Sequence, residues 1–188
     1  MTVYTESFNK ADSTTLGPDL TWTEATGDAE VKSNKWSNVT AGADVHTRAE
    51  HDVSGDAMYT QAIVNVVSGA TNFSVKTRYD SAAQTFYQFE GNAAGSYYRI
   101  VKCVAGTFTN LGSDQSFTWS ASTNYTCRIE ANGSVVTVSV NGGGTYQQSD
   151  SAITGKTRGG LGSNSGVAGD VTFDSFEVGD LAPAATVS

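Results

Sequence analysis

Apolar and polar residues alternate along most of the chain, which is the pattern of half-buried β-strands. The segment 73–79 alternates cleanly and places Phe73 and Tyr79 on the same face of a strand. The run 58–67 is the most apolar part of the chain and predicts a strand at the centre of a sheet. Asn132 and Gly133 separate two further alternating runs and predict a hairpin, because both residues tolerate a positive φ.

The same alternation predicts the remaining strands. They are expected at 3–8, 16–22, 31–39, 45–50, 85–89, 97–104, 108–111, 125–131, 134–140, 159–162 and 171–178. Many short strands joined by turns of Gly, Asn and Asp are typical of a sandwich or barrel, and the sequence shows no repeat of fixed period. We therefore expect residues 1–180 to form a single all-β sandwich domain. The alternation is lost at 181–188, which is expected to be a tail that docks on a partner.

The composition agrees with strands and argues against several classes of partner. Gly accounts for 20 residues and Pro for only 2, as expected for strands joined by tight turns. The net charge is −8, and the 11 Lys and Arg residues form no basic cluster, so we expect neither nucleic acid nor an anionic membrane as a partner. No stretch approaches the roughly 18 apolar residues of a membrane span.

The first residues lack the charged and apolar regions of a secretory signal peptide, which predicts synthesis in a cytoplasm. Cys103 and Cys127 fall on separate predicted strands. Because a cytoplasm disfavours disulfides, we expect two buried thiols, and a bond between the two strands remains the alternative.

Both ends of the chain carry recognisable motifs. They are Phe8-Asn-Lys-Ala-Asp-Ser-Thr-Thr-Leu-Gly17 followed by Trp22, and then the segments 125–142, 160–163 and 173–178. These motifs resemble concanavalin A-like, laminin-G-like domains, of the kind found in bacteriophage capsid or tail accessory proteins. The resemblance implies a two-sheet antiparallel jelly-roll sandwich. It covers the middle of the chain, roughly 40 to 95, only by general character, and it extends to glycan-binding modules, glucanases and phage accessory domains alike.

No catalytic pattern accompanies this resemblance. The glucanases of this fold carry a Glu-x-Asp-x-Glu strand, which the sequence lacks; Asp174 and Glu177 are offset by three and would face opposite ways. The only histidines that could act as a base are His46 and His51, and no serine triad can be identified around them. We expect both histidines at exposed polar positions. The chain is therefore expected not to be an enzyme.

Two kinds of binding site are candidates. In the resembling domains a cation often sits at the sandwich edge, which implies a calcium site at Asp12 and Asp174 completed by loop carbonyls; turn-forming aspartates are the alternative. Sugar sites need an exposed aromatic ring beside polar groups, and the candidates lie near predicted loops or polar faces. They are Tyr87, Tyr98, Trp119 and Tyr146, with packing in the core as the alternative.

The leading functional hypothesis is a non-enzymatic structural or adhesive module of a virion, either a phage capsid decoration or a tail accessory protein. It would be made in the host cytoplasm, dock on other virion subunits through one face or the tail, and present a surface to cell-surface glycans. The alternative is a free carbohydrate-binding module or lectin. A glycoside hydrolase would require two carboxylates facing each other across a cleft.

Overall fold

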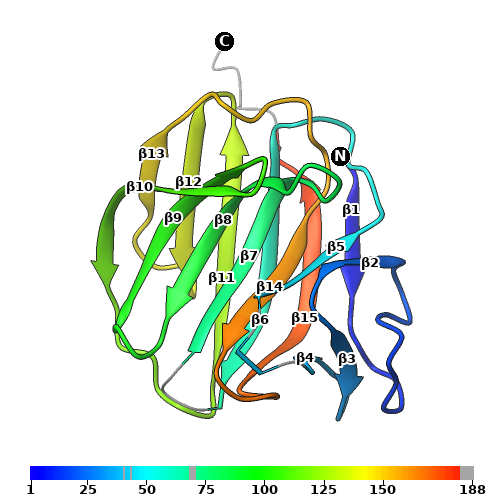
Figure 1. The fold of residues 1–188 in the computed structure, drawn as a ribbon. Helices are drawn as coiled ribbons and strands as arrows, with labels where there is room; N and C mark the ends of the chain where they lie inside the picture. Colours follow the sequence, from blue (N-terminus) through cyan, green and yellow to red (C-terminus); the bar gives the residue numbers. More distant parts are fainter. Residues whose placement is uncertain (40, 43, 68–70, 183–188) are drawn as a thin grey trace.

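The computed structural model describes residues 1–39, 41–42, 44–67 and 71–182, which form two antiparallel sheets packed as a sandwich (Figure 1). The first sheet has the order β13 (Tyr146–Ser149), β12 (Val135–Val140), β11 (Thr123–Asn132), β6 (Met58–Val66), β15 (Val171–Asp180), β4 (Lys35–Asn38) and β3 (Ala29–Lys32), with β1 (Val3–Glu6) also paired to β15. The second has the order β10 (Thr107–Ser116), β9 (Tyr97–Val104), β8 (Thr85–Asn92), β7 (Thr71–Asp80), β14 (Gly160–Ser165), β5 (Asp44–Ala49) and β2 (Trp22–Thr26). The described part of the chain contains no helix, and thus none able to cross a membrane.

The strongest strand signals are confirmed. The apolar run predicted to be central is β6, which lies between β11 and β15. The predicted hairpin joins β11 to β12, and Asn132 pairs with Val135. The turn therefore contains Gly133 and Ser134, one residue later than the Asn-Gly pair, and Gly133 supplies the positive φ of 57°.

Two strands differ from the prediction at the edges of the first sheet. The segment 31–39 is not one strand but contributes to the hairpin of β3 and β4, which reverses at Ser33 and Asn34 with φ of 52° and 62°. Strand β13 was not predicted, because its sequence Tyr-Gln-Gln-Ser lacks an apolar alternation. The burial of β13 does alternate, with Tyr146 and Gln148 half-buried and Gln147 and Ser149 exposed, but a glutamine on the inner face hides this pattern in the sequence.

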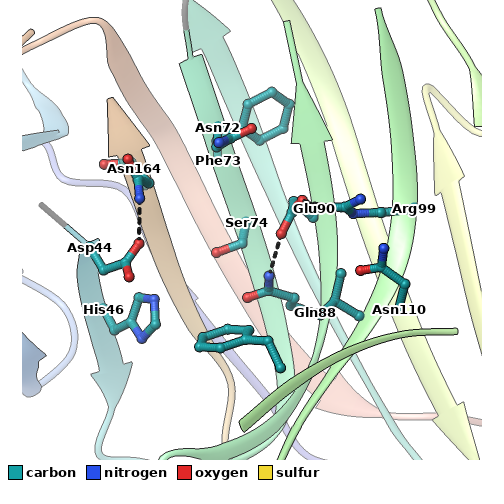
Figure 2. A pocket seen from close by; sticks show the side chains of 13 residues that line it. Asp44, His46, Asn72, Phe73, Ser74, Gln88, Glu90, Arg99, Asn110 and Asn164 are labelled. Atoms are coloured by element: carbon teal, nitrogen blue, oxygen red, sulfur yellow. Dashed lines mark hydrogen bonds and ion pairs between the residues drawn. The ribbon is translucent and has the colours of Figure 1, made fainter. Parts of the chain in front are cut away.

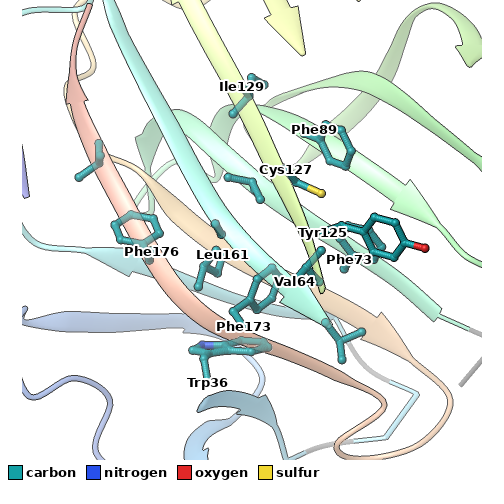
Figure 3. Packing of buried hydrophobic residues seen from close by; sticks show 14 of the residues in the cluster. Trp36, Val64, Phe73, Phe89, Tyr125, Cys127, Ile129, Leu161, Phe173 and Phe176 are labelled. Atoms are coloured by element: carbon teal, nitrogen blue, oxygen red, sulfur yellow. The ribbon is translucent and has the colours of Figure 1, made fainter. Parts of the chain in front are cut away.

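The core fills the space between the two sheets with large aromatic and branched side chains (Figure 3). Trp36 on β4 meets Phe173 on β15 edge to face, with ring centroids 5.1 Å apart. Phe73 on β7 projects into the same core, and its ring occupies the space where a side chain at Gly91 would begin. The strands therefore pack at close range, and no disulfide links the two cysteines.

A bulge in β7 moves Tyr79 to the opposite face from the one predicted. The register between β7 and β8 shifts between Thr77 and Asp80, and Arg78 has a φ of 49°. Tyr79 consequently packs with Phe86 on the outer face of the second sheet, not with the core aromatics. The predicted shared face of Phe73 and Tyr79 is wrong, since alternation ends at a bulge.

The two cysteines are free and buried, as expected: Cys103 lies on β9 and Cys127 on β11, in different sheets. Burial raises the pKa of both thiols. We predict that Ellman's reagent detects no thiol in the native protein and both thiols after unfolding in guanidinium chloride. Failure to detect thiols in the unfolded, unreduced protein would instead indicate a disulfide.

The strands run from Val3 to Asp180. At the end of β15, the Leu181 amide donates to the Ala57 carbonyl at 2.9 Å, so the first residue of the predicted tail is tied to the sandwich. Residues 183–188, most of the segment predicted to dock on a partner, lie outside the described residues.

Candidate functional site

The outer face of the second sheet carries a pocket of about 220 Å³ (Figure 2). The strand register explains how it forms. One row of paired positions crosses five strands, from His46 on β5 through Gly162 on β14, Ser74 on β7 and Glu90 on β8 to Arg99 on β9. Paired residues lie side by side on one face, so the row gathers polar side chains from distant parts of the chain.

One wall of the pocket is a fixed ionic network. The Arg99 guanidinium forms an ion pair with Glu90 at 2.6 Å and lies 3.6 Å from Asp114. The Gln88 amide donates to the other oxygen of Glu90 at 2.9 Å (Figure 2). These contacts hold three planar polar groups in defined orientations, which is the preorganisation that a selective binding site requires.

The opposite wall comes from β5 and β14. Asp44 is exposed, and its carboxylate accepts a hydrogen bond of 2.8 Å from the Asn164 amide. Asn72 on β7 is paired with Asn164 in the register and extends this wall (Figure 2). The pocket is therefore lined on both sides by amides and carboxylates.

Two buried nitrogen bases lie at the pocket: His46 lines it, and Lys76 lies behind it. Lys76 is fully buried; burial lowers the pKa of its ammonium to about 7, against the opposing influence of Asp44, Cys103 and Glu90. His46 is 7% exposed, and burial, followed by the positive charge of Lys76, lowers its pKa to about 2. His46 is thus a neutral imidazole at physiological pH.

Several buried polar atoms of this pocket have no hydrogen-bond partner within the described residues. They are Asn72 Oδ1, Gln88 Oε1 and His46 Nδ1. Buried polar atoms in folded proteins are nearly always paired, because leaving one unpaired costs roughly 1–3 kcal/mol. Their convergence on one cavity points to a polar ligand or ordered water as the missing partner.

An aromatic ring stands at the edge of the pocket. Phe108 on the edge strand β10 is 45% exposed, and its ring contacts those of His46 and Phe86 at centroid distances of 6.2 and 6.0 Å. A half-exposed ring beside polar groups offers an apolar surface to a ligand that has both apolar and polar faces.

Comparisons with known proteins agree on the architecture. No family model matches the chain, and no curated protein matches it in sequence. Solved structures do match over nearly the whole length. A carbohydrate-binding module, CBM66 from Bacillus subtilis, has a TM-score of 0.64 at 14% identity, covering 85% of this chain and 92% of its own. A prokaryotic β-1,3-1,4-glucanase (lichenase) from a mouse hindgut metagenome has a TM-score of 0.68 at 12% identity, covering 96% and 100%.

The galectin LEC-6 from Caenorhabditis elegans is similar to a lesser degree, with a TM-score of 0.51 at 12% identity over 77% of this chain and 94% of its own. The fold is a concanavalin A-like jelly roll. The resemblance inferred from the two ends of the sequence is thus confirmed for the architecture. At these identities the likeness establishes the fold alone, and the function has to be argued from the site.

Of the aromatic residues predicted to bind glycans, Tyr87 and Trp119 are core residues in this jelly roll. Tyr87 is fully buried and its hydroxyl donates to Asp150 at 2.6 Å. Trp119 is 8% exposed, and its indole N–H donates to the Tyr97 carbonyl at 2.9 Å. Neither ring is exposed enough to stack on a sugar, so their burial favours the alternative of packing in the core. An aromatic residue near a predicted loop can be exposed or buried, and the sequence does not separate the two cases.

Tyr98 and Tyr146 are half-buried and pack against the core. The Tyr98 ring stacks on Phe89 at 5.4 Å, whereas the Tyr146 hydroxyl accepts a hydrogen bond from the Ser113 amide. Neither lines the pocket, although the residue after Tyr98 does, on the opposite face of β9. The structure does not bring the four predicted residues into one site.

The two aspartates predicted to bind calcium have other partners. Asp12 accepts a hydrogen bond of 2.8 Å from the Ser33 amide. Asp174 forms an ion pair of 3.2 Å with Lys35 and accepts a hydrogen bond from Asn124. Across the residues described, no three His, Cys, Asp or Glu side chains gather as metal ligands. Calcium at these positions stays a prediction without added support.

The histidines also differ from expectation. His46 is buried beneath the pocket rather than exposed, and His51 is half-buried, with its ring 4.9 Å from that of Tyr4. The sequence did contain a signal for the pocket: Ser74 and Lys76 alternate on β7, Gln88 and Glu90 on β8, and Gly160 and Gly162 on β14. Only the register shows that these pairs are neighbours.

Proposed function

We propose that this protein is a non-catalytic carbohydrate-binding domain that holds a glycan in the pocket on the outer face of its second sheet. The observation that carries the proposal is the convergence of unpartnered, buried polar atoms from Asn72, Gln88 and His46 on that pocket. Sugar hydroxyls both donate and accept hydrogen bonds, so they match amides and a neutral imidazole, and Phe108 matches the apolar face of a sugar ring.

The similar structures support this assignment of ligand class. Two of those named above are by title a carbohydrate-binding module and a galectin. This chain shares their fold and carries a polar pocket with an aromatic edge on one sheet face. Fold likeness raises the expectation of sugar binding, and the pocket supplies the site on which that expectation rests.

The placement of the carboxylates favours binding over hydrolysis. Asp44 and Glu90 do lie on opposite walls of the pocket, which is the arrangement a hydrolase would need (Figure 2). However, β5 and β8 are separated by β14 and β7, so their backbones are roughly 14 Å apart, at about 4.8 Å per strand step. Both oxygens of Glu90 also accept hydrogen bonds, from Arg99 and Gln88, so neither is free to protonate a glycosidic oxygen.

A virion setting stays a prediction from the sequence. None of the similar structures named above is a capsid or tail component. A glycan-binding domain could belong to a virion or to a free protein. The similar structures support the alternative predicted from the sequence, which is a carbohydrate-binding module or lectin.

The proposal is tested by probing a glycan array and soluble β-1,3-1,4-glucan with the native protein, followed by calorimetry on the best ligand. We expect Gln88→Leu to weaken binding at least tenfold. The substitution removes a buried hydrogen-bonding group from the pocket, and it also removes the hydrogen bond that orients the Glu90 carboxylate. Phe108→Ala is expected to weaken it about fivefold through loss of the ring surface.

The matched control is Gln147→Leu on β13, which changes an exposed glutamine in the other sheet and should leave affinity unchanged. Absence of binding to every glycan offered, or equal affinities for the Gln88 and Gln147 variants, would refute the proposed site. Release of reducing sugar from β-1,3-1,4-glucan would refute the non-catalytic part of the proposal.

A further inference from the structure

The strongest unexplained feature of the pocket is the lysine beneath its floor. Lys76 is fully buried, and its ammonium donates to Ser74 Oγ at 2.6 Å. Among the described residues no carboxylate forms an ion pair with it, although its nitrogen lies 5.4 Å from the centroid of the Phe86 ring. A buried charge without a counter-ion is costly, so its retention calls for a role.

The fold makes room for this lysine at one specific place. Gly162 on β14 is paired with Ser74, and a Cβ built on Gly162 would overlap Lys76 Nζ and come within 2.9 Å of Ser74 Oγ. Ser74 lines the pocket, whereas Lys76 lies behind it. The ammonium therefore acts on a ligand only through the serine hydroxyl.

The chemistry of this pair has two states. An ammonium has three donors and no acceptor, so Ser74 Oγ must accept from it, and the hydroxyl proton is free to point into the pocket. A neutral amine has a lone pair, toward which the same hydroxyl can rotate and donate. The protonation of Lys76 thereby decides whether Ser74 presents a donor or an acceptor to the pocket.

We propose that Lys76 is a positioning residue that sets the polarity of the pocket through Ser74, so that a sugar oxygen receives a hydrogen bond from Ser74 when Lys76 is protonated and loses it when Lys76 is neutral. This inference rests on the proposed glycan-binding function. It identifies Ser74 as the residue that touches the ligand and Lys76 as the residue that orients it.

The surroundings place this switch near neutral pH. The ionisable groups near the lysine or beside it in the strand register are Asp44, His46 and Arg48 on β5, Tyr79 on β7, Glu90 on β8, and Arg99 and Cys103 on β9. Burial holds the pKa of Lys76 at about 7, and Asp44 keeps it from falling further. Because the pKa of His46 is about 2, His46 does not titrate in the same range.

The sign of the effect follows from the two states. A ligand that accepts from Ser74 binds best below the pKa of Lys76, and its affinity falls as the pH rises through about 7. Loss of one hydrogen bond to a buried donor corresponds to about a tenfold loss of affinity. We therefore expect the tightest glycan from the array to bind about tenfold more weakly at pH 8.5 than at pH 5.5.

The first measurement needs no ligand. Carbon-13 NMR of the lysine side chains, with Lys76 assigned by its absence in Lys76→Met, should show Lys76 titrating near pH 7 rather than at the usual lysine value of about 10.4. If Lys76→Met does not fold, the assignment can be made by a resonance shifted in Ser74→Ala. Titration of Lys76 near 10.4 would overturn the inference whatever the glycan result.

The second measurement is affinity against pH. Ser74→Ala should bind weakly at both pH values and lose the pH dependence, whereas Lys32→Met, which removes an exposed lysine on β3, should follow the native profile. A flat native profile, or a pH dependence that survives in Ser74→Ala, would overturn the inference while leaving glycan binding intact. Absence of glycan binding at every pH would instead refute the proposed function, and the inference with it.

Discussion

Replacement of Glu6 by alanine is expected to lower the free energy of unfolding by about 3 kcal/mol, one of the two largest effects that we predict for a single substitution in this protein. Glu6 is 1% exposed at the end of β1. One carboxylate oxygen accepts from the Phe8 amide at 2.9 Å, and the other accepts from the Leu20 amide at 2.9 Å and the Trp22 indole at 3.3 Å. Alanine would leave these donors unpaired.

The variant Glu6→Gln separates charge from shape. It preserves the volume but replaces one acceptor oxygen by an amide that cannot accept from the facing donors, so we expect most of the loss to remain. The control is Glu30→Ala, which removes a glutamate whose ion pair with Lys32 is long, at 3.8 Å, and should cost less than 1 kcal/mol. Urea unfolding measures all three; equal costs for the Glu6 and Glu30 alanine variants would contradict the assigned role.

This network also explains the opening motif physically. The segment from Phe8 to Trp22 winds around the Glu6 carboxylate, and Gly17 takes a φ of 81° where a Cβ would overlap the Leu20 carbonyl. The motif is therefore the sequence of a loop whose backbone is held by the buried Glu6 carboxylate. Alternation could not reveal that acid, because a glutamate beside apolar residues in a strand is equally typical of a solvated face.

The architecture was largely predictable because a sandwich repeats one simple rule. A strand with one face in the core must alternate, and β6, β11, β12 and β15 do so over most of their length. The rule fails where a strand is irregular or carries polar residues on its inner face. The bulge at Arg78 reverses the faces beyond it, and the half-buried Gln148 of the edge strand β13 hides the alternation of that strand.

The pocket was not predictable for a related reason. Most outward residues of β7 and β8 are polar, as those of any solvated sheet face would be. What distinguishes them is that Lys76 is buried opposite a glycine, and this depends on the pairing of β7 with a strand that lies some ninety residues later in the chain. Register between distant strands follows from the folded sheet and not from local pattern.

The second large effect is expected at Arg78, where replacement by methionine should lower the free energy of unfolding by about 4 kcal/mol. The side chain is fully buried, and its guanidinium donates to the carbonyls of Asp56 at 2.9 Å, Gly133 at 3.0 Å and Ile153 at 2.8 Å. One residue thus ties together the segment before β6, the β11–β12 turn and the segment after β13.

Methionine fills a similar volume but donates no hydrogen bond, so three carbonyls lose their partner, and the bulge loses the contact that stabilises its left-handed backbone. The control is Arg128→Met on β11, whose guanidinium pairs with Glu130 at 2.7 Å on the outer face and should contribute about 1 kcal/mol or less. Urea unfolding and hydrogen exchange report the difference. Faster exchange confined to the three tethered segments would confirm the role of Arg78, whereas equal stability of the two variants would show that the bulge is held by packing alone.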